Sequence, residues 1–346
     1  KTMINPKITV LMPVYNVALY VRAAIESILN QSYTDFELLI INDGSTDTTR
    51  DEVLKIQDSR IRFIENEKNI GLANTLNKGI ELAKGEYIAR MDGDDISVLN
   101  RLEKQLRILE DNPEIDICGT AYEFFGSRNY AVVYPERNDD IRVGLLFGCC
   151  MIIPMFRRKS ILDANLRYNQ IYFPAEDYRF WTECMLAGLK MYNVQEILFK
   201  YRMHPTQVSE VMTNQKDMTL IVKSEYIIRL FNNWDQTNVE VLKNVFVFRA
   251  EIKSINELRE LKEKTDSIIQ QNKYQNTVNH KALNTKIKSL ISSESAIFVN
   301  RFWFKERYYL QGLFKLILNR LFFELNPKFR LKLILKCIVH KTNNSL

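Results

Sequence analysis

Residues 85–95 read Gly85-Glu86-Tyr87-Ile88-Ala89-Arg90-Met91-Asp92-Gly93-Asp94-Asp95. The part over residues 87–91 has the short apolar character of a buried strand. Three carboxylates follow within four residues, and their mutual repulsion at a strand end favours a bound cation. Hard oxygen ligands select Mg²⁺ or Mn²⁺, which usually complete their shell with substrate phosphates. The stretch predicts a strand that ends in a metal and phosphate site, and a solvated acidic turn is the alternative.

Strand and helix patterns alternate on both sides of this stretch. Apolar runs at residues 8–12, 36–41 and 61–64 predict three more buried strands, and helical periodicity is clearest over residues 72–83 and 101–109. This alternation is typical of an α/β protein with a mainly parallel sheet flanked by helices, which binds ligands at the carboxyl ends of its strands. A helix over residues 176–186 and a strand near 197–201 extend the same domain to about residue 210.

Two further strand ends carry polar groups. Asp43 lies in Asn42-Asp43-Gly44-Ser45-Thr46, where Ser45 or Thr46 would cap the next helix and Gly44 would make the turn. An ionised carboxylate at this place can accept a hydrogen bond from a base N–H, such as that of uracil. The first strand ends in Pro13-Val14-Tyr15-Asn16, which offers backbone groups and an aromatic ring to the same pocket.

Glu176, Asp177 and His204 are the remaining candidates. Glu176 and Asp177 open a predicted helix, where acidic residues often serve only to favour the helix dipole. His204 is one of three histidines and follows a strand, a position at which a histidine taken alone is more often structural than a ligand. Their residue types permit catalysis or metal binding without requiring either.

Composition narrows the class of protein. The 346 residues are 46% hydrophobic and 26% charged, which excludes disorder and fibrous repeats. No run approaches about eighteen apolar residues, so we expect a cytoplasmic protein with no spanning helix and no export signal. The five cysteines show no zinc spacing and predict free thiols in a reducing compartment.

Residues 211–346 read as a helical appendage, in which the polar stretch 270–288 is a candidate linker. The net charge of +6 is uneven, because residues 301–346 carry +8 and the rest of the chain −2. The basic amphipathic tail, about residues 301–340, predicts peripheral contact with the inner face of the cytoplasmic membrane. Packing of its apolar side on the rest of the protein, or in a homodimer, stays open. No nucleic-acid-binding motif accompanies the basic residues.

Six blocks of sequence, taken in this order, resemble family 2 inverting glycosyltransferases of the GT-A fold. The blocks are Val14-Tyr15-Asn16, residues 42–47, Asn69-x-Gly71, residues 85–95, residues 175–181 with Ala175-Glu176-Asp177-Tyr178, and Tyr201-Arg202-x-His204-x-x-Gln207-x-Ser209. The resemblance implies a Rossmann-like GT-A domain over residues 1–210 and the appendage over 211–346. Within the family, the chain is most similar to bacterial lipooligosaccharide and capsule β-1,3-N-acetylglucosaminyltransferases.

The resemblance also implies site residues. Asp43 would bind uracil, and Asp92 would bind the ribose or the metal-bound nucleotide. Asp94 of this DXD motif would hold the Mn²⁺ or Mg²⁺ cofactor, and Asp92 and His204 are its other predicted ligands. Asp177 would be the catalytic base, with Glu176 orienting it or the acceptor. The remaining nucleotide-sugar contacts would be Pro13, Val14, Tyr15, Asn16, Asn69, Asn77, Arg90 and Gly93.

One position departs from the family pattern. Many relatives have Arg-Asn after the Asn-x-Gly motif, and this chain has Leu76-Asn77. A basic contact to the nucleotide is therefore missing or supplied by another residue.

The implied reaction is transfer of one hexose or N-acetylhexosamine from a UDP-sugar to a glycan hydroxyl, in surface polysaccharide or lipooligosaccharide synthesis. UDP-GlcNAc is favoured over UDP-Gal, UDP-Glc and UDP-GalNAc, and the acceptor would be a glycan or a lipid-linked glycan. The Gln-x-x-Arg-Trp pattern of processive synthases does not occur, which favours a single transfer. A non-catalytic nucleotide-sugar-binding module is the alternative. A dinucleotide-dependent oxidoreductase would need a glycine-rich turn after the first strand, which this sequence lacks.

Overall fold

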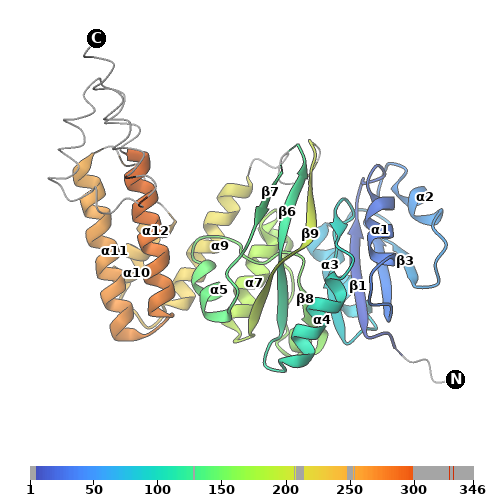
Figure 1. The fold of residues 1–346 in the computed structure, drawn as a ribbon, viewed down its shortest axis with the longest axis horizontal. Coiled ribbons are helices and arrows are strands. Elements are labelled where there is room, and N and C mark those ends of the chain that lie inside the picture. The colour runs from blue at the N-terminus through green and yellow to red at the C-terminus, as the bar shows by residue number, and fades with distance from the viewer. Residues whose placement is uncertain are drawn as a thin grey trace, which may run out of the picture. The chain divides into compact units, whose positions relative to one another are not determined.

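The computed structural model describes residues 5–127, 129–205, 207, 214–247, 252, 254–298, 327 and 330. The chain divides into two compact units, with the boundary between Arg229 and Leu230. The first unit is an α/β domain and the described part of the second is helical (Figure 1). Each unit is therefore considered by itself.

The first half of the α/β unit is a parallel sheet. Strands β1 (Ile8–Val14), β2 (Phe36–Asn42), β3 (Ile61–Glu65) and β4 (Tyr87–Arg90) lie in the order β3-β2-β1-β4 and are parallel to one another. They are connected through α1 (Val21–Leu29), α2 (Thr49–Leu54) and α3 (Leu72–Leu82). β1 and β2 are buried along their whole length, as expected of apolar strands covered by helices on both faces. The predicted elements of this half are confirmed, with small differences at their ends.

The second half of the sheet is mixed. β8 (Met155–Arg157) runs antiparallel to β4, and β6 (Ile117–Gly126), β9 (Met191–Met203) and β5 (Ile96–Ser97) follow it in the sheet. With β7 (Tyr130–Val132) beside β6, the described strands make one nine-stranded sheet. The helices of this half are α4 (Arg101–Asp111), α5 (Asn138–Gly144), α6 (Arg158–Asp163), the 3₁₀ turn η1 (Gln170–Tyr172) and α7 (Glu176–Leu186). The predicted α/β class, with a mainly parallel first half, is confirmed.

Helix α9 (Gln215–Leu230) packs with the first unit. The Tyr226 hydroxyl donates to the Arg142 carbonyl at 3.0 Å, and Glu225 forms an ion pair with Arg179 of α7. The first compact unit thus continues past the predicted boundary near residue 210 as far as Arg229.

The predicted linker over residues 270–288 is wrong. These residues end α11 (Ile255–Gln275), turn at Asn276 with a left-handed φ of 51°, and begin α12 (His280–Phe298). The buried Asn272 side chain donates to the Val278 carbonyl at 2.9 Å and accepts from its N–H at 3.0 Å. Amide side chains that close a helix–helix turn are the same residue types that fill linkers, so composition alone was misleading. With α10 (Gln236–Phe246), these helices are the described elements of the second unit.

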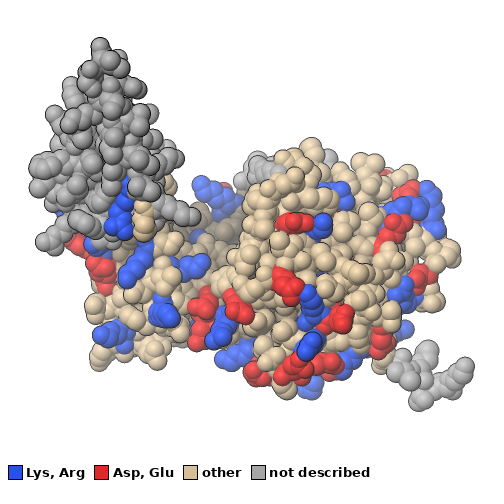
Figure 2. All heavy atoms as spheres, in the orientation of Figure 1, with Lys and Arg blue, Asp and Glu red and all other residues tan. Residues whose placement is uncertain are grey.

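The basic tail predicted over residues 301–340 lies outside the described residues, apart from Pro327 and Arg330. Membrane contact through it therefore stays a prediction. Over the described part of the first unit, acidic and basic side chains are interspersed on the face drawn in Figure 2. Among the described helices, none combines the length and the apolar character needed to cross a bilayer.

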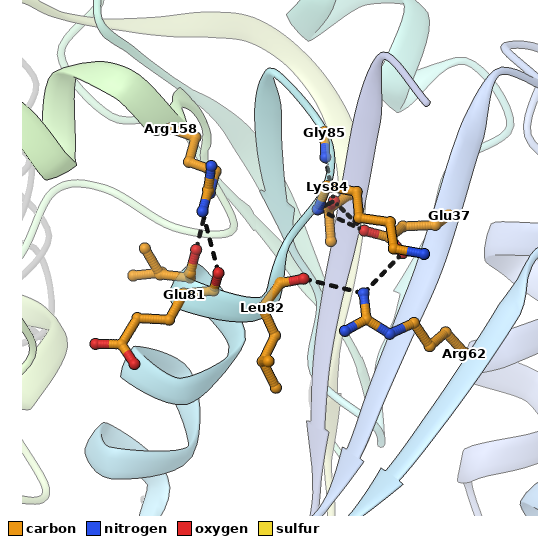
Figure 3. A network of polar contacts seen from close by, with 9 residues as sticks. Glu37, Arg62, Glu81, Leu82, Lys84, Gly85 and Arg158 are labelled. Atoms are coloured by element: carbon orange, nitrogen blue, oxygen red, sulfur yellow. Dashed lines mark hydrogen bonds and ion pairs between the residues drawn. The ribbon is translucent and has the colours of Figure 1, made fainter. Parts of the chain in front are cut away.

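Two arginines hold the C-terminal end of α3 (Figure 3). Arg158 donates to the carbonyls of Ile80 at 2.9 Å and Glu81 at 3.0 Å. Arg62 of β3 donates to the Leu82 carbonyl at 2.9 Å. The last carbonyls of a helix have no partner within the helix, so these contacts satisfy them and attach α3 to the rest of the domain.

Thr9 and Glu37 form the buried part of the same network. Thr9 Oγ1 donates to Glu37 Oε1 at 2.7 Å and accepts from the Gly85 N–H at 2.9 Å. Thr9 is fully buried, so no solvent can replace these partners. The side chain thus satisfies a backbone donor at the start of β4.

Thr9→Val should destabilise the fold. The substitution keeps the shape of the side chain but leaves the Gly85 N–H buried without an acceptor, which costs about 1–3 kcal/mol. We expect the free energy of unfolding in urea to fall by this amount. Thr34→Val, at an exposed position, is the control and should change little. Equal stability of the two variants would contradict the role given to Thr9.

Candidate active site

The acidic loop after β4 lies against the end of β9. Arg202 donates its backbone N–H to Asp95 Oδ1 at 2.6 Å and its Nε–H to the Asp94 carbonyl at 2.7 Å. His204 Nε2 lies 3.0 Å from Asp94 Oδ2. The pairing of β9 with β5 makes these contacts possible. Two of the predicted metal ligands, Asp94 and His204, are thereby brought together.

Asp94 and His204 can supply part of a divalent-cation site. The third predicted ligand, Asp92, instead accepts a hydrogen bond from Arg90 at 3.1 Å. No cluster of three His, Cys, Asp or Glu side chains suited to a metal occurs within the described ranges. Mg²⁺ and Mn²⁺ are commonly held by one or two carboxylates together with substrate phosphates. These residues thus fit an ion that substrate phosphates help to hold, and do not form a closed protein cage.

Arg202 and Tyr20 support this loop and were absent from the predicted site. The Arg202 guanidinium lies over the rings of Tyr20 and Phe125, at 4.9 and 4.5 Å from their centroids. The Tyr20 and His204 ring centroids are 4.6 Å apart. Arg202 was visible in the sequence as part of the motif that ends in His204, whereas no local pattern indicated Tyr20.

Arg90, at the end of β4, joins two carboxylates from different parts of the chain. Its Nη2 donates to Asp92 Oδ1 at 3.1 Å, and its Nη1 donates to Asp177 Oδ2 of α7. Burial acts to lower the pKa of Arg90, which is 5% exposed, but Asp177 and Asp92 hold it above the usual value. The predicted base and the predicted nucleotide contact therefore share one guanidinium.

Buried polar atoms without a hydrogen-bond partner gather at the N-terminus of α7. Within the described residues they include Arg90 Nε, Tyr168 Oη, Glu176 Oε2 and Asp177 Oδ1, and Tyr168 lies within electrostatic range of the other three. Buried polar groups are normally hydrogen-bonded, so these atoms are candidates for contact with a polar group of a ligand. Burial, followed by repulsion from Asp177, raises the pKa of Glu176 to about 8. Glu176 thus retains its proton at neutral pH.

The end of β1 lies at the same edge of the sheet as the loop after β2 and the acidic loop after β4. Asn16 has a φ of 53°, and its Oδ1 accepts from the Thr46 N–H at 2.8 Å. A Cβ at Gly93 would lie 2.8 Å from Val14 Cγ1, so the backbone there approaches β1 closely. Pro13 and Val14 are buried, and the Tyr15 side chain is 46% exposed. The structure thus brings these predicted residues together, with the Asn16 side chain joining two loops.

Asp43 lies at the end of β2 with 3% of its surface exposed. Its carboxylate accepts from the backbone N–H groups of Ile70 and Gly71, each at 3.0 Å. Asn69 Oδ1 also accepts from the Gly71 N–H at 3.0 Å. The side chains of Asp43 and Asn69 therefore meet where α3 begins.

Asn77 connects two segments of the chain near the site. The Asn77 side chain donates to the Tyr168 carbonyl at 2.8 Å and accepts from its N–H at 2.9 Å. It thereby ties α3 to the segment before α7.

Arg101 is fully buried and donates to the Arg90 carbonyl at 3.0 Å and Ser97 Oγ at 2.7 Å. Burial lowers the pKa of Arg101 to about 9. The sequence pattern of α4 did not indicate this role.

Comparisons with known proteins agree with this geometry. The family model described as Glycosyl transferase family 2 matches residues 9–167. An uncharacterized glycosyltransferase of Haemophilus influenzae is 32% identical over 259 residues, which cover 69% of this chain and 79% of the relative. The putative glycosyltransferase EpsE of Bacillus subtilis is 35% identical over 206 residues, 57% of this chain and 73% of EpsE.

Among solved structures, TarS 1–349 of S. aureus in complex with UDP-GlcNAc has a similar fold. Its TM-score is 0.58 over 85% of this chain and 87% of TarS, at 16% sequence identity. At this identity the likeness shows the fold alone, and it confirms the predicted GT-A architecture. The specific resemblance to β-1,3-N-acetylglucosaminyltransferases stays a prediction. The H. influenzae relative shows that this chain belongs to the glycosyltransferases, and the matched model identifies residues 9–167 as a domain of glycosyl transferase family 2.

Proposed function

We propose that this protein transfers a single sugar from a UDP-sugar to a hydroxyl of a glycan acceptor, with inversion of configuration and with Mn²⁺ or Mg²⁺ as cofactor. The observation that carries the proposal is the hydrogen bonding of the two Asp177 carboxylate oxygens. One oxygen accepts from Arg90, and the other is buried without a partner within the described residues. The Asp177 side chain as a whole is 32% exposed, so a carboxylate fixed by Arg90 is offered to an incoming hydroxyl.

The chain's own residues account for the proton and for the orientation of the reacting groups. The acceptor hydroxyl attacks the anomeric carbon from the face opposite UDP, UDP departs, and Asp177 takes the hydroxyl proton while Arg90 holds the carboxylate in place. Glu176 keeps its proton at neutral pH and can donate a hydrogen bond to the acceptor. A divalent cation, held by Asp94 and His204 with the substrate phosphates, would supply several kcal/mol by offsetting charge on the diphosphate.

The proposed donor and acceptor rest on the fold neighbour and on the sequence resemblance. UDP-GlcNAc is the favoured donor, because the fold neighbour TarS is seen in complex with UDP-GlcNAc and the sequence resembles N-acetylglucosaminyltransferases. UDP-Gal, UDP-Glc and UDP-GalNAc are the other candidates, and a lipooligosaccharide or other surface glycan is the proposed acceptor. Release of UDP from each UDP-sugar in a hydrolysis assay ranks the donors. Tight binding without any UDP release would favour the non-catalytic binding module.

Asp177→Asn should abolish transfer while leaving UDP affinity close to wild type. The amide keeps the shape of the side chain but cannot take the hydroxyl proton, and positioned bases contribute about 10²- to 10⁴-fold to the rate. Turnover is measured as UDP release and affinity by calorimetry. Asp163→Asn, exposed at the end of α6, is the control. Joint loss of turnover and UDP affinity in Asp177→Asn would contradict the assignment.

Glu176 should make the folding stability depend on pH. Between its ordinary pKa of 4.5 and the raised value of about 8, the unfolded chain loses this proton and the folded chain keeps it. Stability therefore falls as pH rises through this window. Glu176→Gln removes that contribution, so the difference in unfolding free energy between variant and wild type should shift in favour of the variant from pH 5 to pH 8. A difference that stays constant across this range would count against a protonated Glu176.

Removal of divalent metal should abolish turnover. Treatment with EDTA is expected to stop UDP release, and added Mn²⁺ or Mg²⁺ is expected to restore it. Asp94→Asn should raise the metal concentration needed for half-maximal activity, whereas Asp139→Asn, exposed on α5, should not. Full turnover in EDTA would overturn the metal role of Asp94.

A further inference from the structure

The hydrogen bonds around Asp43 limit what its carboxylate can bind. An ionised carboxylate offers about four acceptor positions, two on each oxygen. Oδ1 accepts from Asn66 Nδ2 at 2.8 Å and from the Ile70 N–H at 3.0 Å, and Oδ2 accepts from the Gly71 N–H at 3.0 Å. Both positions on Oδ1 are therefore used, and one remains on Oδ2.

The orientation of Asn66 is set by Lys78. Lys78 Nζ donates to Asn66 Oδ1 at 2.6 Å, and Asn66 Nδ2 donates to Asp43 Oδ1 and to Thr75 Oγ1 at 3.1 Å. An ammonium group can only donate and a carboxylate can only accept, so the chemistry leaves one way to place the amide. Asn66 is 8% exposed, which limits exchange with water. Lys78 thus keeps an N–H of Asn66 on Asp43 Oδ1.

Nucleobases differ in what they present to a carboxylate with one free position. Uracil has a single imide N–H between two carbonyls, which needs one acceptor. Guanine presents a ring N–H and an amino group side by side, which need an acceptor on each carboxylate oxygen. Cytosine presents an amino group beside an unprotonated ring nitrogen, so when the amino group donates to the carboxylate, the lone pair of that nitrogen faces the carboxylate and is repelled. A site built for one hydrogen-bonding pattern rejects a base that leaves buried polar groups unpaired.

We propose that Lys78, acting through Asn66, is a positioning residue that leaves Asp43 one acceptor position and so selects a 2,4-dioxopyrimidine nucleotide over guanine and cytosine nucleotides. The inference rests on the proposed nucleotide-sugar site. Lys78 acts on the base through the amide of Asn66 and through Asp43.

The test is calorimetric titration of the full chain with UDP, GDP and CDP, with Mg²⁺ present throughout. The wild type should bind UDP about 10- to 100-fold more tightly than GDP or CDP, the range expected for one unpaired buried polar group. Lys78→Met removes the donor that anchors Asn66 Oδ1, so the amide can leave Asp43 Oδ1 when a base offers a second N–H to that oxygen. The ratio of UDP to GDP affinity should then fall about ten-fold. Lys78→Arg, which retains a donor, should keep most of the selectivity.

Lys84→Met is the matched control, because it removes the same charge from an exposed position just after α3. Its UDP to GDP ratio should equal that of the wild type. If Lys78→Met weakens UDP and GDP equally, Lys78 is merely structural and the inference fails while the proposed function stands. A wild type that prefers GDP also overturns the inference. If the wild type binds none of the three nucleotides, the inference and the proposed function fail together.

Discussion

The candidate active site depends on the Arg90 guanidinium, which pairs with Asp92 from its own loop and with Asp177 from α7. Two carboxylates that would repel each other are held in one region because a buried cation lies between them. Arg101 holds the backbone of Arg90 by donating a hydrogen bond to the Arg90 carbonyl. Asp92 and Asp177 are therefore coupled by electrostatics as well as by the fold, and a change at Arg90 would affect both carboxylates.

Much of the first half was predictable because its signals are local. Apolar runs ending in Asp43 and Asp92 marked buried strands, and the carboxyl ends of adjacent parallel strands necessarily meet. The role of Arg90 was not readable in the same way, since its partner Asp177 is 87 positions away. The contacts of Tyr20 and Arg101 were not predicted for a related reason. An isolated aromatic or basic residue in a helical pattern does not indicate which residues it will contact.

The family model covers only part of the α/β unit. It covers residues 9–167, which contain Asp43, Asp92 and Asp94, whereas Asp177 and His204 lie beyond it. The amide-rich turn around Asn272 shows the opposite failure, in which composition predicted a linker where specific hydrogen bonds close two helices. In that turn, the hydrogen bonds between Asn272 and Val278 decide the structure, and residue type alone does not.

The contacts between the acidic loop and the end of β9 have a consequence for folding. His204 and Asp94 are 110 positions apart, and Arg202 and Asp95 are 107 apart. Contacts of such separation carry a large loop-closure entropy and form only after much of the intervening chain has been ordered. During synthesis, a chain that has emerged only as far as α7 already contains Asp43 and Asp94, but His204 is still to come. Formation of the contact between Asp94 and His204 therefore requires that the sheet has been completed as far as β9.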